Sequence, residues 1–127
     1  MPSPLTLDIK VFAPAKDFDT SLAFYQALGW ELIGKYDSLA ELQLGDHRFF
    51  LQDYYQKDWA ENFMFYIHVK NVQSWYEHIE KALANGHYEG ARVVKPNMQD
   101  HGHMVCFLHD PSGILLHFAQ DVSKYPV

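Results

Sequence analysis

Two stretches of the chain repeat apolar residues at the spacing of an amphipathic helix. The first runs from Asp17 to Gly29, and its final glycine stands where a left-handed helix cap belongs. The second runs from Asn71 or Val72 to about Asn85. The pattern therefore predicts one helix in each half of the chain.

An extended segment precedes each predicted helix, Leu5 to Ala13 in the first half and Phe63 to Lys70 in the second. Residues of a strand alternate between two faces. We expect the more aliphatic face to cover the helices and the other face to be free to line a binding site. The aliphatic face comprises Leu7, Ile9, Val11, Phe65, Ile67 and Val69, and the other face comprises Asp8, Lys10, Phe12, Met64, Tyr66 and His68.

Three further strand-like runs follow each helix and are separated by turn residues. They cover Trp30 to Tyr36, Leu39 to Leu44, Arg48 to Asp53, Ala91 to Lys95, Met104 to His109, and Ile114 to Gln120. The order strand, helix, three strands thus occurs twice, in modules at residues 5–53 and 63–120 that are joined by residues 54–62. We expect residues 1–127 to form a single domain.

Composition and charge exclude several classes of partner. The net charge of −6, without a cluster of Lys or Arg, disfavours nucleic acid, and no apolar run is long enough to cross a membrane. The lone Cys106 cannot form an internal disulfide, and the N-terminus lacks a secretion signal, so we expect a cytoplasmic location.

Aromatic residues make up 16% of the chain, which indicates a thick core, a ring-lined pocket or an apolar subunit interface.

Two short sequences carry local signatures in a specific order. Lys16 to Trp30 contains the pattern Ser-x-x-Phe-Tyr-x-x-Leu-Gly, and Phe107 to Phe118 contains Asp-Pro-x-Gly. Both resemble signatures of the glyoxalase/bleomycin-resistance/extradiol dioxygenase (vicinal oxygen chelate) superfamily. The resemblance implies an α+β fold in which two tandem βαβββ modules form a U-shaped, eight-stranded mixed sheet with the helices on the outer face. It also implies a homodimer, in which a pocket can be completed across the subunit interface.

Enzymes of this superfamily hold one divalent metal ion with four side chains from the first and last strands of both modules. The resemblance places at these positions Lys10 (or Asp8 or Thr6), Phe50 or Gln52, Met64, and His117. A protonated lysine has no lone pair, and a thioether is too soft for ions that prefer carboxylates and imidazoles. We therefore expect no cofactor, and a metal-independent binding protein of the bleomycin-resistance type that holds a hydrophobic or planar small molecule in an aromatic-lined cavity.

The histidines leave a second hypothesis open. Imidazole suits zinc, nickel and iron, so His117 with His68, His101 or His103 would form an atypical site for a divalent metal. The protein would then be a lyase or dioxygenase, similar to lactoylglutathione lyases. A four-residue turn at residues 110–113, however, pairs Cys106 with His117 and leaves His103 on the opposite face.

The same register leaves His109 on that opposite face and collects the candidate ligand-binding residues on the other. They are Lys10, Phe12, Phe50, Gln52, Met64, Tyr66, His68, Met104, Cys106, Leu108, Leu115 and His117. This surface is apolar and rich in sulfur and rings, as small-molecule sites are. His68 and His117 are candidates for binding an anionic group or transferring a proton, and Cys106 beside His117 is a candidate nucleophile.

Overall fold

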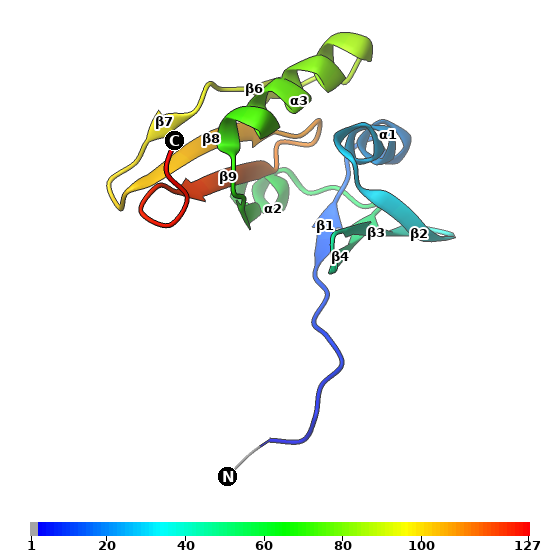
Figure 1. Ribbon diagram of the computed structural model, residues 1–127. Helices are drawn as coiled ribbons and strands as arrows, with labels where there is room; N and C mark the ends of the chain where they lie inside the picture. The colour runs from blue at the N-terminus through cyan, green and yellow to red at the C-terminus, as the bar shows by residue number, and fades with distance from the viewer. Residues whose placement is uncertain (1–2) are drawn as a thin grey trace.

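The computed structural model describes residues 3–127 and has an α+β fold with the repeat that the sequence predicts (Figure 1). The first module contains β1 (Phe12–Pro14), α1 (Phe18–Leu28), β2 (Glu31–Tyr36), β3 (Leu39–Leu44) and β4 (His47–Gln52). The second contains β5 (Met64–His68), α3 (Val72–Asn85), β6 (Arg92–Val93), β7 (Asn97–Met98), β8 (His103–His109) and β9 (Leu115–Asp121). The connection between the modules includes an additional short helix, α2 (Lys57–Asn62).

Both predicted helices are confirmed, and their ends follow from local chemistry. The Asp17 side chain accepts a hydrogen bond from the backbone N–H of Thr20 at the start of α1, and Asn71 does the same for Ser74 at the start of α3. Gly29 ends α1 with φ 113°, a backbone conformation that L side chains rarely adopt. Within residues 3–127, every helix is too short or too polar to cross a lipid bilayer.

Each module forms its own sheet. The strand order is β1-β4-β3-β2 in the first sheet and β5-β9-β8-β6 in the second, where β7 also pairs with β8. In both sheets the first strand of the module lies parallel to the last, and all other pairs are antiparallel. The two modules therefore repeat one topology, and β7 is an addition to the second.

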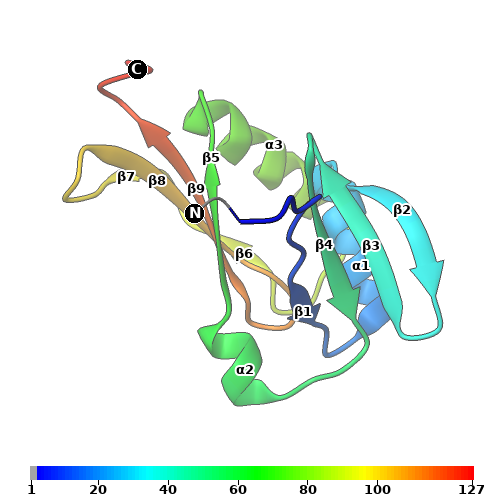
Figure 2. The same cartoon turned by 90° about the horizontal axis from the view of Figure 1, so that it is seen from below.

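Both long helices cover the same side of the two sheets (Figure 1, Figure 2). Tyr25 of α1 contacts the ring of Phe49 at a centroid distance of 5.3 Å, and Trp75 of α3 stacks on Phe118 at 4.9 Å. These rings belong to one buried cluster that runs through both modules. The faces that are opposite to the helices are called here the open faces of the first and second sheets.

The extent of the first strand differs from the prediction. The sequence pattern predicts a strand from Leu5 to Ala13, whereas β1 covers only Phe12–Pro14. Residues 3–11 form an extended N-terminal arm that leaves the body of the chain (Figure 1). Phe12 pairs with Phe50 in parallel, so β4, which begins at His47, offers no partner to the beginning of the arm. An alternating pattern makes a strand only where a neighbouring strand is present.

Candidate functional site

The hairpin between β8 and β9 has a longer loop than the sequence pattern predicts. Asp110 Oδ1 accepts hydrogen bonds from the backbone N–H groups of Ser112 and Ile114, and Asp110 N donates to Ile114 O. Ile114 therefore belongs to the loop, and His109 pairs with Leu115. This one-residue difference reverses which side chains of β8 share a face with β9.

The prediction that Cys106 pairs with His117 is therefore wrong, because Phe107 is the partner of His117. His103 and His109 lie on the same face as His117, and not on the opposite one. Three candidate residues move to the helix side of the sheet, where the core cluster contains them: Met104, Cys106 and Leu108. We therefore exclude these three from the open face.

The open face of the second sheet brings together residues of four strands. Tyr66 of β5 lies beside His117 of β9, and Phe107 of β8 lies beside His117 on the other side. The ring centroids of Tyr66 and His117 are 5.4 Å apart, and those of Phe107 and His117 are 5.1 Å apart. These three rings, called here the ring row, form a continuous aromatic surface across three strands, with interplanar angles of 39° between Tyr66 and His117 and 66° between Phe107 and His117. Its neighbours on the same face are Met64, His68, His103, His109, Leu115 and Arg92.

The ring row remains accessible at one end. Tyr66 is 53% exposed, and its neighbour Met64 is 61% exposed. His117 is partly buried between its two aromatic neighbours, and this burial lowers its pKa. Burial and the nearby Arg92 guanidinium lower the pKa of His109 as well. Both imidazoles are therefore mainly uncharged at neutral pH.

Cys106 does not have the environment of a nucleophile. Its Sγ is buried, donates to Val94 O at 3.2 Å, and lies on the opposite side of the sheet from His117. Burial raises the pKa of the thiol to about 11. The hypothesis of a Cys106 and His117 pair is therefore wrong.

The histidines of the open face do not converge on one point. The ring of Tyr66 is adjacent to both His68 and His117, with centroid distances of 5.0 Å and 5.4 Å, and the two histidines lie at different register positions. His68 and His103 are neighbours at 5.8 Å, and His101 lies 6.3 Å from His103. Among residues 3–127, no group of three or more His, Cys, Asp or Glu side chains is arranged to hold a metal ion. The donors present therefore do not make a complete metal site by themselves.

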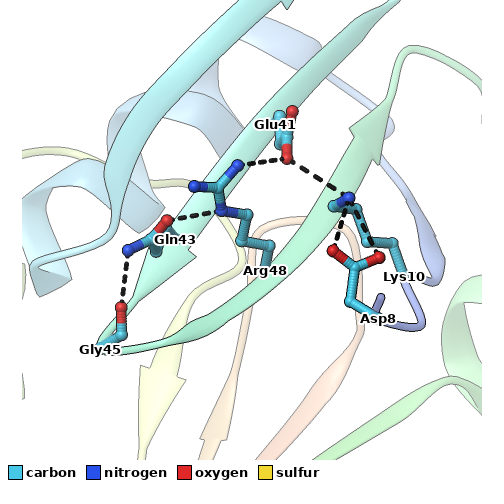
Figure 3. Close-up of polar contacts among 6 residues, drawn as sticks. All are labelled: Asp8, Lys10, Glu41, Gln43, Gly45 and Arg48. Atoms are coloured by element: carbon cyan, nitrogen blue, oxygen red, sulfur yellow. Dashed lines mark hydrogen bonds and ion pairs between the residues drawn. The ribbon is translucent and has the colours of Figure 1, made fainter. Parts of the chain in front are cut away.

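The open face of the first sheet is occupied by a polar network (Figure 3). Glu41 Oε2 lies 3.0 Å from an Arg48 nitrogen and 3.8 Å from Lys10 Nζ, and Lys10 also pairs with Asp8 at 3.2 Å. Arg48 Nε donates to the amide oxygen of Gln43. The charges of this network compensate one another. Lys10 is thus engaged in ion pairs.

Two other candidates of the first module stack beside this network. The rings of Phe12 and Phe50 have centroids 5.1 Å apart. Gln52, which pairs with both Pro14 and Leu39, shares their face. Three candidate residues of the first module thus share one face of the sheet, and Lys10 of the N-terminal arm reaches the same face through Glu41 and makes it polar.

A groove of about 400 Å³ lies between the two modules. The root of the N-terminal arm, the start of β4 and the strand β5 form its walls. Its apolar lining includes Trp30, Phe49, Phe65 and Ile67, and its polar lining includes Arg48. We call this the inter-module groove.

Comparison with known families gives one match that covers most of the chain. Residues 9–118 match the model of the Glyoxalase/Bleomycin resistance protein/Dioxygenase superfamily. The chain belongs to this superfamily. A search of curated proteins finds no match.

Several solved structures have the same fold as this chain. A bleomycin resistance determinant encoded on the transposon Tn5 aligns with a TM-score of 0.76 at 24% identity, over 90% of this chain and 98% of that one. A bleomycin-binding protein from Streptomyces verticillus, solved with copper(II)-bleomycin, aligns with a TM-score of 0.74 at 20% identity, over 91% and 97%. A lactoylglutathione lyase from Agrobacterium tumefaciens aligns with a TM-score of 0.64 at 15% identity, over 91% and 95%. The fold therefore accommodates both binding proteins and an enzyme.

Three residues of the site escape the analysis of the sequence. Phe107 and His109 are missed because the hairpin register is displaced by one residue. Arg92 is missed because β6 contains only two residues and has no pattern of its own. The signal for the longer loop is Asp110 itself, because an aspartate side chain can accept from backbone N–H groups that follow it and so enlarge a turn.

Proposed function

We propose that the protein binds small, apolar or planar molecules on the open face of its second sheet, as a homodimer and without a metal ion. The ring row of Tyr66, His117 and Phe107 carries this proposal. Each aromatic contact contributes about 0.5–1.5 kcal/mol beyond the burial of area, so a ligand that covers several rings gains useful affinity.

The exposure of this surface supports a binding role. Met64 and Tyr66 are exposed at 61% and 53%, and leaving large apolar side chains in water is unfavourable. Contiguous apolar surface on a folded chain commonly marks a binding site. The likeness to two proteins described as binding bleomycin, or as determining resistance to it, supports the same class of function.

The N-terminal arm supports the homodimer. Three large apolar side chains of the arm are almost fully exposed, at 99% for Leu5, 101% for Leu7 and 86% for Ile9. In an extended chain, alternate residues lie on one side, so these three share a side with Val11 and the buried Ala13. Val11 already lines the inter-module groove, and so does Ile9. We propose that the arm of a second copy lies in this groove and packs these leucines against its apolar lining. The groove walls then come from two chains.

Sedimentation experiments test the homodimer. We expect Leu7→Asp to convert a dimer into a monomer, because a carboxylate at this position would be buried in the groove. Thr6→Asp is the matched control. Thr6 lies on the other side of the extended arm, so this variant should remain dimeric. A dimer of unchanged stability in Leu7→Asp would refute the role of the arm.

Fluorescence titration with the neutral probe N-phenyl-1-naphthylamine tests the binding site. We expect Phe107→Ala and Tyr66→Ala to weaken the binding of this probe by about tenfold, as the loss of one good ring contact predicts. The matched control is Tyr54→Ala, because Tyr54 is similarly exposed at 51% and lies outside the open face. Equal losses in all three variants, or no saturable binding by the unsubstituted protein, would contradict the proposal.

Elemental analysis tests metal independence. Protein purified without a chelator should contain zinc, nickel, iron and manganese well below one equivalent, and treatment with a chelator should not change the affinity for the probe. A stoichiometric metal would instead favour a lyase or dioxygenase with a histidine-centred site.

The cytoplasm is the compartment that we propose for this activity. Cys106 is a buried free thiol, and the reducing conditions of the cytoplasm keep a thiol in this state.

A further inference from the structure

Basic side chains are concentrated on the strands of the second sheet. These strands contain Arg92, His68, His103, His109 and His117, and all five lie on the open face. As the structure describes them, the same strands contain one carboxylate, Asp121, although the whole chain carries 16 acidic residues and a net charge of −6. On the described strands of this sheet, Arg92 is therefore the one side chain that carries a permanent positive charge.

The carboxylate and Arg92 lie at different ends of this face. Asp121 pairs with His103 at the beginning of β8, whereas Arg92 pairs with His109 at the end of β8. Asp121 Oδ1 is also occupied locally, because it accepts from the backbone N–H and the hydroxyl of Ser123 at 3.0 Å and 2.6 Å. Asp121 therefore does not compensate the charge of Arg92.

Arg92 is a cation without a carboxylate partner. The ion pairs found within residues 3–127 join Lys10 and Arg48 to acids of the first module. Arg92 makes one polar side-chain contact, from its guanidinium to Nε2 of His109 at 3.5 Å. A guanidinium can only donate, so His109 accepts through Nε2 and remains uncharged. The guanidinium thus lies beside an imidazole of the open face, and within residues 3–127 its other N–H groups have no side-chain partner.

The guanidinium and the nearer end of the ring row, Phe107 and His117, are close enough for one ligand. Arg92, His109 and Leu115 form one row across the sheet, and Phe107, His117 and Tyr66 form the next. The two rows are about 7 Å apart along β8, and neighbouring strands are about 4.8 Å apart, so Phe107 and His117 are the rings nearest to Arg92 and Tyr66 is the farthest. A fused aromatic ring with one acidic substituent spans this distance.

We propose that the open face of the second sheet binds planar aromatic acids, with the ring of the ligand on Phe107 and His117 and its anionic group on Arg92. This inference rests on the proposed binding function and names the chemical class of its ligand. A guanidinium binds a carboxylate through two parallel hydrogen bonds, which favours an acid over a neutral ring of the same shape. The negative net charge acts over longer distances and is screened by salt, so the local cation decides the preference.

The test compares two ligands of nearly equal shape, 1-naphthoate and 1-naphthamide, by calorimetry or intrinsic fluorescence. We expect the protein to bind naphthoate about tenfold more tightly than naphthamide, the ratio that one charge-assisted contact provides. Arg92→Gln should abolish this preference by weakening the binding of naphthoate to the level of naphthamide. Arg92→Lys should retain only part of it, because an ammonium does not offer the planar pair of donors.

Lys81→Gln is the matched control. Lys81 is exposed on α3, on the other side of the sheet, and its substitution changes the net charge by the same amount as Arg92→Gln. The preference for naphthoate should persist in Lys81→Gln. A preference that survives Arg92→Gln, or that falls equally in both variants, would overturn the role of Arg92.

The two proposals fail in different ways. If naphthamide binds and naphthoate binds no better, the ligand class is wrong and the binding function stands. If 1-naphthoate, 1-naphthamide and the neutral probe N-phenyl-1-naphthylamine all fail to bind, the binding function itself is wrong. Arg92 is exposed at the edge of the sheet, so its variants should fold, and circular dichroism checks this.

Discussion

The hydroxyl of Tyr25 donates a hydrogen bond of 2.7 Å to Oδ2 of Asp110, and both residues are buried. Tyr25 belongs to α1 of the first module, and Asp110 begins the loop of the last hairpin of the second. Beside this bond, the hydroxyl oxygens of Ser21 and Ser112 are 3.2 Å apart. The two sequence signatures that resemble the superfamily therefore contact each other, and their polar residues join the modules.

Removing the Tyr25 hydroxyl should destabilise the fold. Tyr25→Phe leaves Oδ2 of the buried Asp110 without its donor, and such a loss costs about 1–3 kcal/mol. Urea unfolding followed by circular dichroism measures this change. Tyr76→Phe is the control, because the Tyr76 hydroxyl bonds Glu80 on the helix surface and its loss should change the unfolding midpoint little. Equal midpoints for the two variants would contradict a joining role for Tyr25.

Stability should fall on mild acidification because of His117. Burial lowers the pKa of His117 below its ordinary value of 6.5, so the unfolded chain takes up this proton more readily than the folded chain. The contribution of His117 to the free energy of unfolding is thus complete above about pH 7. It is lost as the pH falls through the pKa of His117 in the folded protein. Urea midpoints at about pH 7.5 and about pH 5.5 should differ less for His117→Gln than for the unsubstituted protein. An equal difference would show that His117 does not titrate on unfolding.

Cys106 should react slowly with thiol reagents. Its pKa of about 11 leaves a very small fraction of thiolate at neutral pH, and its sulfur is buried. We expect modification by iodoacetamide to be at least about tenfold slower in the folded protein than in urea. The chain has one cysteine, so mass spectrometry reports this site alone. Rapid modification of the folded protein would contradict the burial of Cys106.

A side chain at Gly29 should weaken the end of α1. Gly29 has φ 113°, and a Cβ built there meets no atom within 4 Å, so the cost comes from the backbone conformation and not from a clash. Gly29→Ala should lower the free energy of unfolding by about 1–2 kcal/mol, as measured in urea. Gly29→Asn should cost less, because asparagine tolerates positive φ better than alanine. Equal effects of the two substitutions would point to another cause.

The features predicted correctly from the sequence are those that depend on near neighbours along the chain. The helix between Asp17 and Gly29 is determined by its own apolar stripe and caps, and the order of elements in each module follows from similar local patterns. The alternation along β5 was also predictable, because Phe65 and Ile67 face the core while Tyr66 faces the open side.

The features that escaped prediction depend on contacts between distant segments or on single side chains. The arm before Phe12 has the pattern of a strand but lacks a neighbouring strand in its own chain. The register of β8 against β9 depends on two hydrogen bonds to one oxygen of Asp110, which hold Ile114 in the loop. That single residue decided whether Cys106 or Phe107 lies beside His117.

The strand β5 is an edge strand of its sheet and pairs only with β9. Its five residues include neither lysine nor proline, which commonly prevent an edge strand from pairing with a strand of another chain. A newly made chain whose inter-module groove is still empty is thus prone to self-assembly through β5. We expect a chain that lacks residues 3–11 to accumulate in inclusion bodies, and slow synthesis of the full chain to favour recovery of native protein.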